Sequence, residues 1–326
     1  MNNSEDRLLS VVVPIYNERV GLPDFHAALW RSLHDDVGEP FEIIYVDDGS
    51  TDDTAELVRK WHAEDTNVRL LSLSRNFGKE NALSAGIAAA RGKAIISLDG
   101  DGQHPPELIP KFVEAWRNGA QVVIGVRSGK SAANLSKRVG SSLFYKLFNK
   151  MTGQKLLPGS TDYRLLDQAV RRPFLELTET DRITRGLIDW LGFKRQYINF
   201  NPHDRQQGTP GYGYRKLLGL ATNSFVSLTL APLYVFGYLG VIITFLAFLL
   251  GSAVLIEQIL LDDPWHWKFT GTAMLGILII FLVGIVLMSQ GILSLYISHL
   301  HNQSKRRPLY VIDYHASAGI REHGED

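Results

Sequence analysis

Two aspartates, Asp99 and Asp101, are separated by a single glycine and come directly after a short apolar run. Two carboxylates with this spacing at a strand end can share one hard divalent cation, and such a cation can neutralise a diphosphate. Asp and Gly are also the residues that tight turns prefer, so the segment taken alone fits a turn equally well. An EF-hand is excluded, because His104 and Pro110 stand where that loop needs Gly and Glu.

A second acidic segment, residues 47–53, has the same relation to an apolar run. Its later acids, 52–53, follow Ser and Thr, which is typical of the first turn of a helix. Asp47 and Asp48 precede that turn, so we expect them to be available for hydrogen bonds to a base or a ribose. The matching position of the two acidic segments favours the metal interpretation of the first.

The elements that must position these acids alternate along the chain. Apolar, β-branched runs alternate with helix-like stretches, which is the pattern of a parallel sheet covered by helices on both faces. We therefore predict a doubly wound α/β domain over residues 1–130, with an anionic, metal-bound ligand at the carboxyl ends of the strands. The runs are 9–15, 41–46, 68–73, 93–98 and 121–126, and the helix-like stretches lie near 21–36, 52–64, 79–91 and 106–118.

The apolar residues of the 326-residue chain are concentrated near its C-terminal end. Residues 217–256 and 269–304 contain no Asp, Glu, Lys or Arg. Each run exceeds the roughly 20 residues with which a helix crosses the ~30 Å hydrocarbon core of a bilayer. We predict an interfacial juxtamembrane helix over 217–232 and two transmembrane helices within 233–304, near 233–258 and 270–296.

Basic residues flank the two predicted spans. Arg215 and Lys216 precede the first span and residues 305–307 follow the second, whereas the loop between the spans carries two acids and one lysine. The positive-inside rule then puts the α/β domain and the tail, 305–326, on the cytoplasmic side. The polar, acidic N-terminus does not resemble a signal peptide. We expect an integral protein of the cytoplasmic (inner) membrane.

Several function classes are disfavoured. The absence of cysteine excludes disulfides and thiolate metal sites, and the balance of 34 Lys+Arg against 34 Asp+Glu argues against a nucleic-acid partner. Residues 125–131 imitate a phosphate-binding P-loop but are one residue short between the glycines, and no G-x-G-x-x-G follows a strand.

Residues 131–216 are less periodic than the first domain. Basic and aromatic residues interleave over 137–148, which fits either an amphipathic helix at a membrane surface or a core-packing helix with a solvated basic face. In the first predicted span, Gly237, Gly240 and Gly251 would permit close helix contacts and hence a homo-oligomer.

Four segments in order resemble family 2 glycosyltransferases, and within that family the polyprenyl-phosphate glycosyltransferases, the group of dolichyl-phosphate mannose synthase and the bacterial undecaprenyl-phosphate glucosyltransferases. The similarity extends over about residues 9–310. It implies a GT-A fold, with the nucleotide-sugar core at 1–130 and an acceptor-side part with a mobile loop at 131–216. The segments read VVVPIYNE (11–18), VDDGSTD (46–52), RNFGKE (75–80) and LDGDGQHPPE (98–107).

The resemblance also implies roles for individual residues. Mg(II) or Mn(II) would be held against the donor diphosphate by Asp99, Asp101 and Gln103. Arg127 and Arg205 would face phosphates, where a guanidinium fork fits best. The residues implied to bind the donor are Pro14, Tyr16, Glu18, Val46, Asp47, Asp48, Lys79, Asp99, Gly100, Asp101, Arg127 and Arg205.

On the acceptor side, Asp162 matches the acidic position nearest the acceptor and is expected to be a base or an orienting group, the alternative being a helix cap. Arg138 is the candidate for binding the lipid phosphate. The mobile loop, 205–212, departs from the family because Gly211 stands where a lysine is usual. Either another basic residue (Arg138, Arg215 or Lys216) supplies the charge, or the donor preference differs.

The expected reaction is inverting transfer of one sugar from a nucleotide sugar, UDP-glucose first and GDP-mannose second, to a polyprenyl phosphate of the undecaprenyl or dolichyl type. A phosphate monoester with a second pKa near ~6 is largely a dianion at neutral pH, so it needs positioning more than deprotonation. The expected catalytic residues are Asp101, Arg127 and Asp162. Two alternatives remain: a processive polysaccharide synthase, which normally adds a Q-x-x-R-W motif and more spans, and a non-catalytic membrane scaffold that binds nucleotide sugars.

Overall fold

The computed structural model divides the chain into two compact units. One unit is Met1–Pro210 together with Arg307–Asp326, and the other is Gly211–Arg306. Arg138, Arg205, Gly211, the predicted helix over 137–148 and the predicted juxtamembrane helix lie outside the residues that the structure describes. The described residues are 9–128, 159–179, 182–201, 271–305 and 307–320, with helical positions at 238, 242, 245, 246 and 249.

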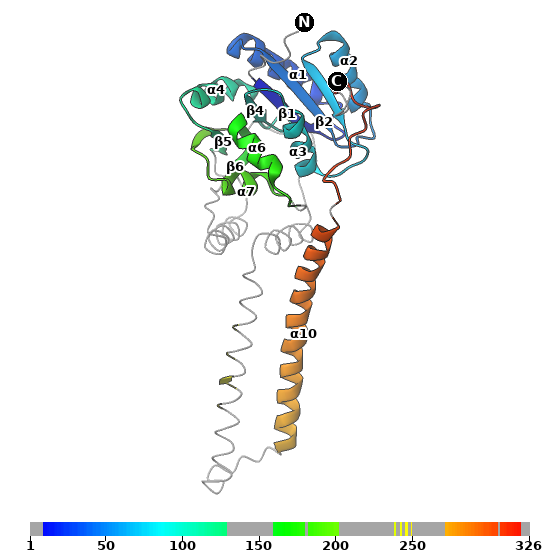
Figure 1. The fold of residues 1–326 in the computed structure, drawn as a ribbon, viewed down its shortest axis with the longest axis vertical. Coiled ribbons are helices and arrows are strands. Elements are labelled where there is room, and N and C mark those ends of the chain that lie inside the picture. Colours follow the sequence, from blue (N-terminus) through cyan, green and yellow to red (C-terminus); the bar gives the residue numbers. More distant parts are fainter. Residues whose placement is uncertain are drawn as a thin grey trace. The chain divides into compact units, whose positions relative to one another are not determined.

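A seven-stranded sheet with the order β3-β2-β1-β4-β6-β5-β7 forms the centre of the first unit (Figure 1). Neighbouring strands are parallel except at β6, which pairs antiparallel with both β4 and β5. The predicted mostly parallel α/β sheet is therefore confirmed. The strands are β1 (Leu9–Ile15), β2 (Phe41–Asp47), β3 (Val68–Ser72), β4 (Ala94–Ser97), β5 (Val122–Arg127), β6 (Ser160–Asp167) and β7 (Arg195–Phe200).

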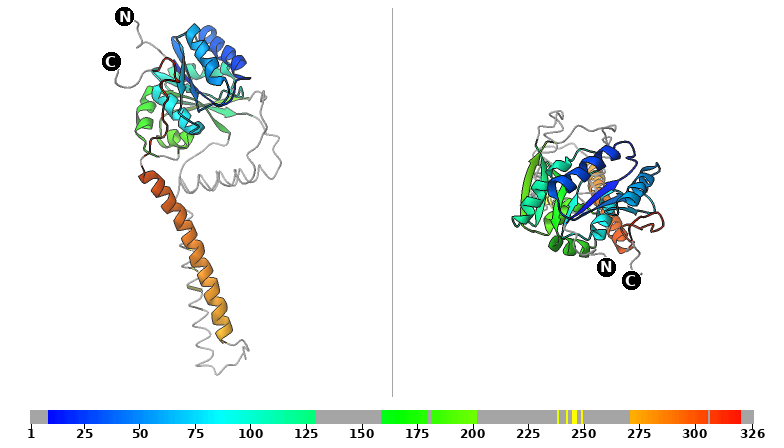
Figure 2. Two further views of the ribbon diagram at one scale, coloured as in Figure 1. Left: turned by 90° about the vertical axis from the view of Figure 1, so that its right-hand side faces the viewer. Right: turned by 90° about the horizontal axis from the view of Figure 1, so that it is seen from above.

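Helices cover both faces of this sheet, as the doubly wound pattern requires (Figures 1 and 2). One core lies beneath α1, α2 and α4, and the other lies beneath α3, α6 and α7. Strands β2, β3 and β4 are buried along their whole length, which explains their continuous apolar runs. The helices are α1 (Leu22–Arg31), α2 (Thr54–Glu64), α3 (Lys79–Ala89), α4 (Ile109–Arg117), α6 (Gln168–Glu176) and α7 (Thr184–Trp190), with single turns η1 (Ser32–Val37) and η2 (Pro106–Leu108).

A buried ion pair joins the strands near their amino ends. Arg69 of β3 donates to Glu42 of β2 at 2.6 Å, and Ser10 of β1 donates to the same carboxylate at 2.6 Å. Burial raises the pKa of Glu42, but Arg69, Ser10 and a backbone hydrogen bond from Arg91 outweigh it and hold the pKa below its usual value. The network ties three parallel strands to the connection between α3 and β4.

The segment 307–320 packs against β3, the edge strand of the sheet. Isolated bridges pair Leu70 with Ala318 and Leu73 with Ile312, and Arg59 of α2 donates to the Ala316 carbonyl at 2.9 Å. Figures 1 and 2 show this dark red segment beside β3. These residues were predicted only as a tail, whereas in the structure they belong to the first unit.

In the second unit, α10 (Gly271–Ser304) is a 34-residue helix that covers the second predicted span. Its window Phe281–Ser298 is long and apolar enough to cross a membrane by length and composition, and it is the one such helix among the described residues. The first predicted span, 233–258, falls mostly outside those residues. Two transmembrane helices are therefore not confirmed.

Candidate active site

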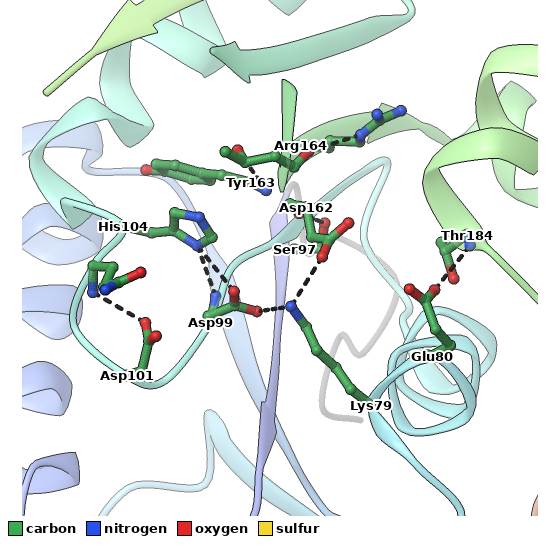
Figure 3. A network of polar contacts seen from close by, with 12 residues as sticks. Lys79, Glu80, Ser97, Asp99, Asp101, His104, Asp162, Tyr163, Arg164 and Thr184 are labelled. Atoms are coloured by element: carbon green, nitrogen blue, oxygen red, sulfur yellow. Dashed lines mark hydrogen bonds and ion pairs between the residues drawn. The ribbon is translucent and has the colours of Figure 1, made fainter. Parts of the chain in front are cut away.

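The Lys79 ammonium lies between two carboxylates at the carboxyl edge of the sheet (Figure 3). Its Nζ is 2.6 Å from Asp99 Oδ1 and 2.9 Å from Asp162 Oδ2. Lys79 begins α3, Asp99 follows β4, and Asp162 stands early in β6. Because β6 runs antiparallel to β4, its beginning meets the end of β4, where Ser97 Oγ donates to the Asp162 carbonyl at 2.7 Å.

These charges stabilise one another. Burial acts to raise the pKa of Asp162, but the cations around it, Lys79 first and then Arg185 and Arg164, bring the pKa below its ordinary value. Burial acts to lower the pKa of Lys79, and the carboxylates of Asp99 and Asp162 more than reverse this. Both partners are thus charged at neutral pH. An ion-paired carboxylate with a lowered pKa is a weak base and a good orienting anion.

Hydrogen bonds from its backbone to its own side chains fix the loop after β4. The Asp99 N–H donates to His104 Nδ1 at 3.0 Å, and the Gln103 N–H donates to Asp101 Oδ1 at 3.1 Å. Arg127, at the end of β5, donates to Gln103 Oε1 at 2.9 Å. The structure therefore brings the three predicted metal ligands into one short loop, with the predicted phosphate-binding arginine attached to it.

Two buried aromatic side chains, those of His104 and Tyr163, hold this loop in place. His104 is buried at 1% exposure, and burial lowers the pKa of its imidazole. Its ring packs against Tyr163 of β6, whose hydroxyl donates to the Pro105 carbonyl at 3.0 Å. Neither residue was a predicted site residue. The sequence signal that was available is the position of His104 and Pro105 directly after the acidic pair.

Glu18, in the loop that follows β1, lies against the backbone of Gly100. A Cβ at position 100 would stand 2.6 Å from Glu18 Oε2, so a side chain there would displace the carboxylate. Tyr16 beside it is 45% exposed, whereas the neighbouring strand residue Val46 is fully buried in the core beneath α3. Of the residues implied to bind the nucleoside, Tyr16 is thus open to a ligand and Val46 is enclosed.

Asp47 and Asp48 are both engaged by backbone N–H groups. Asp48 accepts from Phe77 at 2.7 Å and from Gly78 at 2.9 Å, and Asp47 accepts from Ser50 at 3.1 Å. Burial raises the pKa of both carboxyls, although these hydrogen bonds act against it. The expected availability of the two acids is therefore restricted, because each helps to hold a loop at the sheet edge.

The chemistry of the ligand set fits a hard divalent cation. No group of three or more His, Asp or Glu side chains in the described part of the chain forms a finished metal site. The Asp99, Asp101 and Gln103 side chains nevertheless offer the oxygen donors that Mg(II) and Mn(II) prefer. The Lys79 ammonium against Asp99 shows that this loop already accommodates a positive charge.

The family model described as Glycosyl transferase family 2 matches residues 10–175. This chain belongs to glycosyl transferase family 2. The matched region contains the sheet edge with Asp99, Asp101 and Asp162. The predicted family membership and the predicted enzyme class, a glycosyltransferase, are therefore confirmed.

Relatives within the family match nearly the whole chain. An uncharacterized glycosyltransferase of Synechocystis sp. is 37% identical over 93% of this chain and 94% of its own length. A bactoprenol glucosyl transferase of Shigella phage SfV is 33% identical over 93% of this chain and 97% of its own. A prophage bactoprenol glucosyl transferase homolog of Escherichia coli is also 33% identical, with coverages of 93% and 98%.

A solved structure with a lower identity also resembles this glycosyltransferase. The mannosyltransferase PcManGT from Pyrobaculum calidifontis, in complex with GDP-Man and Mn²⁺, has a TM-score of 0.45 and 17% identity over 66% of this chain and 61% of its own.

Arg185 is a basic residue near the site that was not predicted from the sequence. Arg185, in the first turn of α7, is exposed and contributes to lowering the pKa of Asp162. Nothing in the aperiodic stretch 131–216 marked it, because the contact depends on how β6 and α7 pack. Its backbone is fixed by Thr184, whose N–H donates to Glu80 of α3 at 2.8 Å (Figure 3).

Proposed function

We propose that this glycosyltransferase transfers one sugar from a nucleotide sugar to the phosphate of a polyprenyl phosphate, with inversion at the anomeric carbon and with a divalent metal. UDP-glucose is the first choice of donor and GDP-mannose the second. The names of the relatives from Shigella phage and Escherichia coli support a lipid acceptor and a glucosyl donor. The observation that carries the proposal is the loop of oxygen ligands beside the Lys79–Asp162 pair.

In this proposal Asp99, Asp101 and Gln103 hold the metal, and Arg127 contacts a phosphate of the donor. The bound cation would supply electrostatic stabilisation of the departing nucleoside diphosphate. Tyr16 is exposed at the end of β1 and can pack against the nucleoside. The charges fit a metal-bound diphosphate at the carboxyl ends of the strands, where ligands of open α/β sheets bind.

Asp162 orients the acceptor rather than deprotonating it. Its pKa lies below the ordinary value despite burial, because Lys79 pairs with it at 2.9 Å. A phosphate monoester acceptor is already largely a dianion at neutral pH and needs no base. A displacement in which the lipid phosphate attacks the anomeric carbon directly would invert it, since no enzyme carboxylate attacks first.

The acceptor requires that the enzyme work at a membrane, and we propose that α10 crosses the cytoplasmic membrane. Only two residues separate Ser304, where α10 ends, from Arg307, where the segment on β3 begins. A chain this short cannot cross a bilayer again. The C-terminal end of α10 and the sheet would therefore lie on the same side, and the basic residues near the ends of the predicted spans favour the cytoplasmic side.

The test is a transfer assay on the purified full chain in lipid. Radiolabelled UDP-glucose and, separately, GDP-mannose are supplied with undecaprenyl phosphate and either Mn(II) or Mg(II), and the label that enters organic solvent is counted. We expect label in a product that carries one sugar, and loss of that product when EDTA is added. A ladder of products would indicate a processive polymerase, and no product with any of a wide set of donors would indicate a binding scaffold.

A further inference from the structure

Arg185 is a solvent-exposed cation whose guanidinium has no salt-bridge or hydrogen-bond partner among the described residues. Other cations of this edge already have partners. Lys79 pairs with two carboxylates, Arg127 donates to Gln103, and Arg164 pairs with Asp189 at 3.0 Å. Arg185 can therefore bind an incoming anion without breaking a salt bridge or hydrogen bond between its guanidinium and the described residues.

The backbone of Arg185 is held next to the site from two directions. Arg164 stands two positions after Asp162 in β6, and its Nη1 donates to the Arg185 carbonyl at 3.4 Å. The preceding residue, Thr184, donates its N–H at 2.8 Å to Glu80, which directly follows Lys79. Arg164 thus lies in the same strand as Asp162, and Glu80 lies in the same helix as Lys79 (Figure 3).

The carboxylates of the site create a need for such a cation. A phosphate that approaches Asp99, Asp101 and Asp162 is repelled unless positive charge compensates them. The Arg164 side chain, from the same strand as Asp162, donates to the Arg185 carbonyl, and the charge of Arg185 acts to lower the pKa of Asp162. A guanidinium is also the group that matches phosphate oxygens with two parallel hydrogen bonds.

We propose that Arg185 is a phosphate-binding residue of the active site, which supplies positive charge against the carboxylates of Asp99, Asp101 and Asp162. The inference rests on the proposed function for the identity of the two possible phosphates. One is the diphosphate of the donor, and the other is the monophosphate of the lipid acceptor.

The experiment measures binding without turnover on the detergent-solubilised full chain. Wild type is compared with Arg185→Gln, Arg185→Lys and a matched control, Arg172→Gln. Arg172 is 88% exposed on α6 and pairs only with Glu176 of the same helix among the described residues. The ligands are UDP with Mn(II), GDP with Mn(II), undecaprenyl phosphate, and undecaprenol, which lacks the phosphate. Unfolding temperatures are recorded for each variant.

We expect Arg185→Gln to weaken the binding of one phosphate ligand by about 10- to 100-fold, the usual effect of losing a hydrogen bond to a charged group. Weaker nucleotide binding would identify the donor diphosphate. Weaker binding of undecaprenyl phosphate, with undecaprenol unaffected, would identify the acceptor. Arg185→Lys should restore part of the affinity, and Arg172→Gln should bind like wild type.

Binding of both phosphate ligands within about twofold of wild type would overturn the proposal, as would an equal loss in Arg172→Gln. A loss accompanied by a lower unfolding temperature of Arg185→Gln would assign the residue a structural role and also overturn it. If wild type binds the ligands but transfers no sugar from any donor, the proposed function fails, while these binding data still decide the role of Arg185.

Discussion

The two ends of the sheet carry ionic networks of opposite character. Near the amino ends of the strands, the Arg69 and Glu42 side chains are 4% and 0% exposed. At the carboxyl ends, the side chains of Lys79, Asp99 and Asp162 are 44%, 21% and 20% exposed. The first network is closed to water, and both backbone donors and backbone acceptors bind it. The second network is partly exposed to solvent, and two carboxylates share its one lysine.

This difference shows which network can exchange partners. Separating Arg69 from Glu42 would leave a charge in a region without water, at a cost of several kcal/mol. Lys79, Asp99 and Asp162 are partly exposed, so water or a ligand can replace their pairing, and separating them costs less than separating the fully buried pair. The amino end therefore serves folding, and the carboxyl end is free to serve binding.

The largest effect is expected from Asp101→Asn at the carboxyl end. Removing one charged ligand of the metal should lower the rate of sugar transfer by about 1,000-fold or more, because electrostatic stabilisation of the leaving group is lost. The unfolding temperature should stay within about 2 °C of wild type, since the loop lies at the surface. Transfer kinetics and calorimetry measure the two quantities, and wild-type turnover in this variant would contradict the metal assignment.

At the amino end, Arg69→Met should have the reverse effect. Breaking a buried pair on one side costs about 3–5 kcal/mol, so the unfolding temperature should fall by about 6–20 °C. The rate per folded molecule should be unchanged at a temperature where the variant is folded. Arg172→Met, at an exposed position, is the control and should unfold like wild type. A stable Arg69→Met would mean that the network contributes little.

Lys79→Met sharpens the comparison, because it removes the same kind of charge at the open end. The free energy of unfolding should fall by less than in Arg69→Met, because this pair is only partly buried. Sugar transfer should fall by about 10- to 100-fold, since a charged contact near the donor is lost. Denaturation curves and transfer rates measured on one preparation test both parts. A destabilisation as large as that of Arg69→Met would remove the distinction between the two ends.

The smallest expected effect is the loss of the stabilising contribution of Glu42 at low pH. The folded-state pKa of Glu42 is lowered, since Arg69, Ser10 and a backbone donor outweigh its burial. Its contribution to stability is therefore complete above the pKa of the unfolded chain, near ~4.3, and is lost as the pH falls through the lower folded-state pKa. The gap in unfolding temperature between wild type and Glu42→Gln should narrow from pH 7 to pH 3. A gap that stayed constant would show that Glu42 does not titrate in this way.

The sequence predicted the five strands β1 to β5 because each is buried in a continuous apolar run. It did not predict β6 or β7. In β6 the charged Arg164 interrupts the apolar pattern, and its burial is offset by the ion pair with Asp189 of α7 and by hydrogen bonds to the Thr161 and Arg185 carbonyls. In β7 most residues are half-buried or exposed, so the strand at this edge lacks the apolar signal.

The same distinction holds for the site. Asp99 and Asp101 are recognisable because their spacing is local, and the structure gathers them with Gln103 in one loop. The pairing of Lys79 with Asp162 spans 83 positions of the chain and depends on an antiparallel strand that the alternating pattern does not reveal. The role of Arg185 depends on that same packing. The family resemblance supplied Lys79 and Asp162 as site residues, but their pairing with each other was not predicted, and Arg185 was not predicted at all.

The segment 307–320 has a consequence for how the enzyme is handled. An exposed edge strand offers unpaired backbone donors and acceptors to any other extended chain, and such edges promote self-association. Here the protein's own C-terminal residues occupy part of that edge through Ala318 and Ile312. Removing the residues after α10 would uncover the backbone donors and acceptors of β3, so a shortened protein would be prone to aggregate for reasons unrelated to its chemistry.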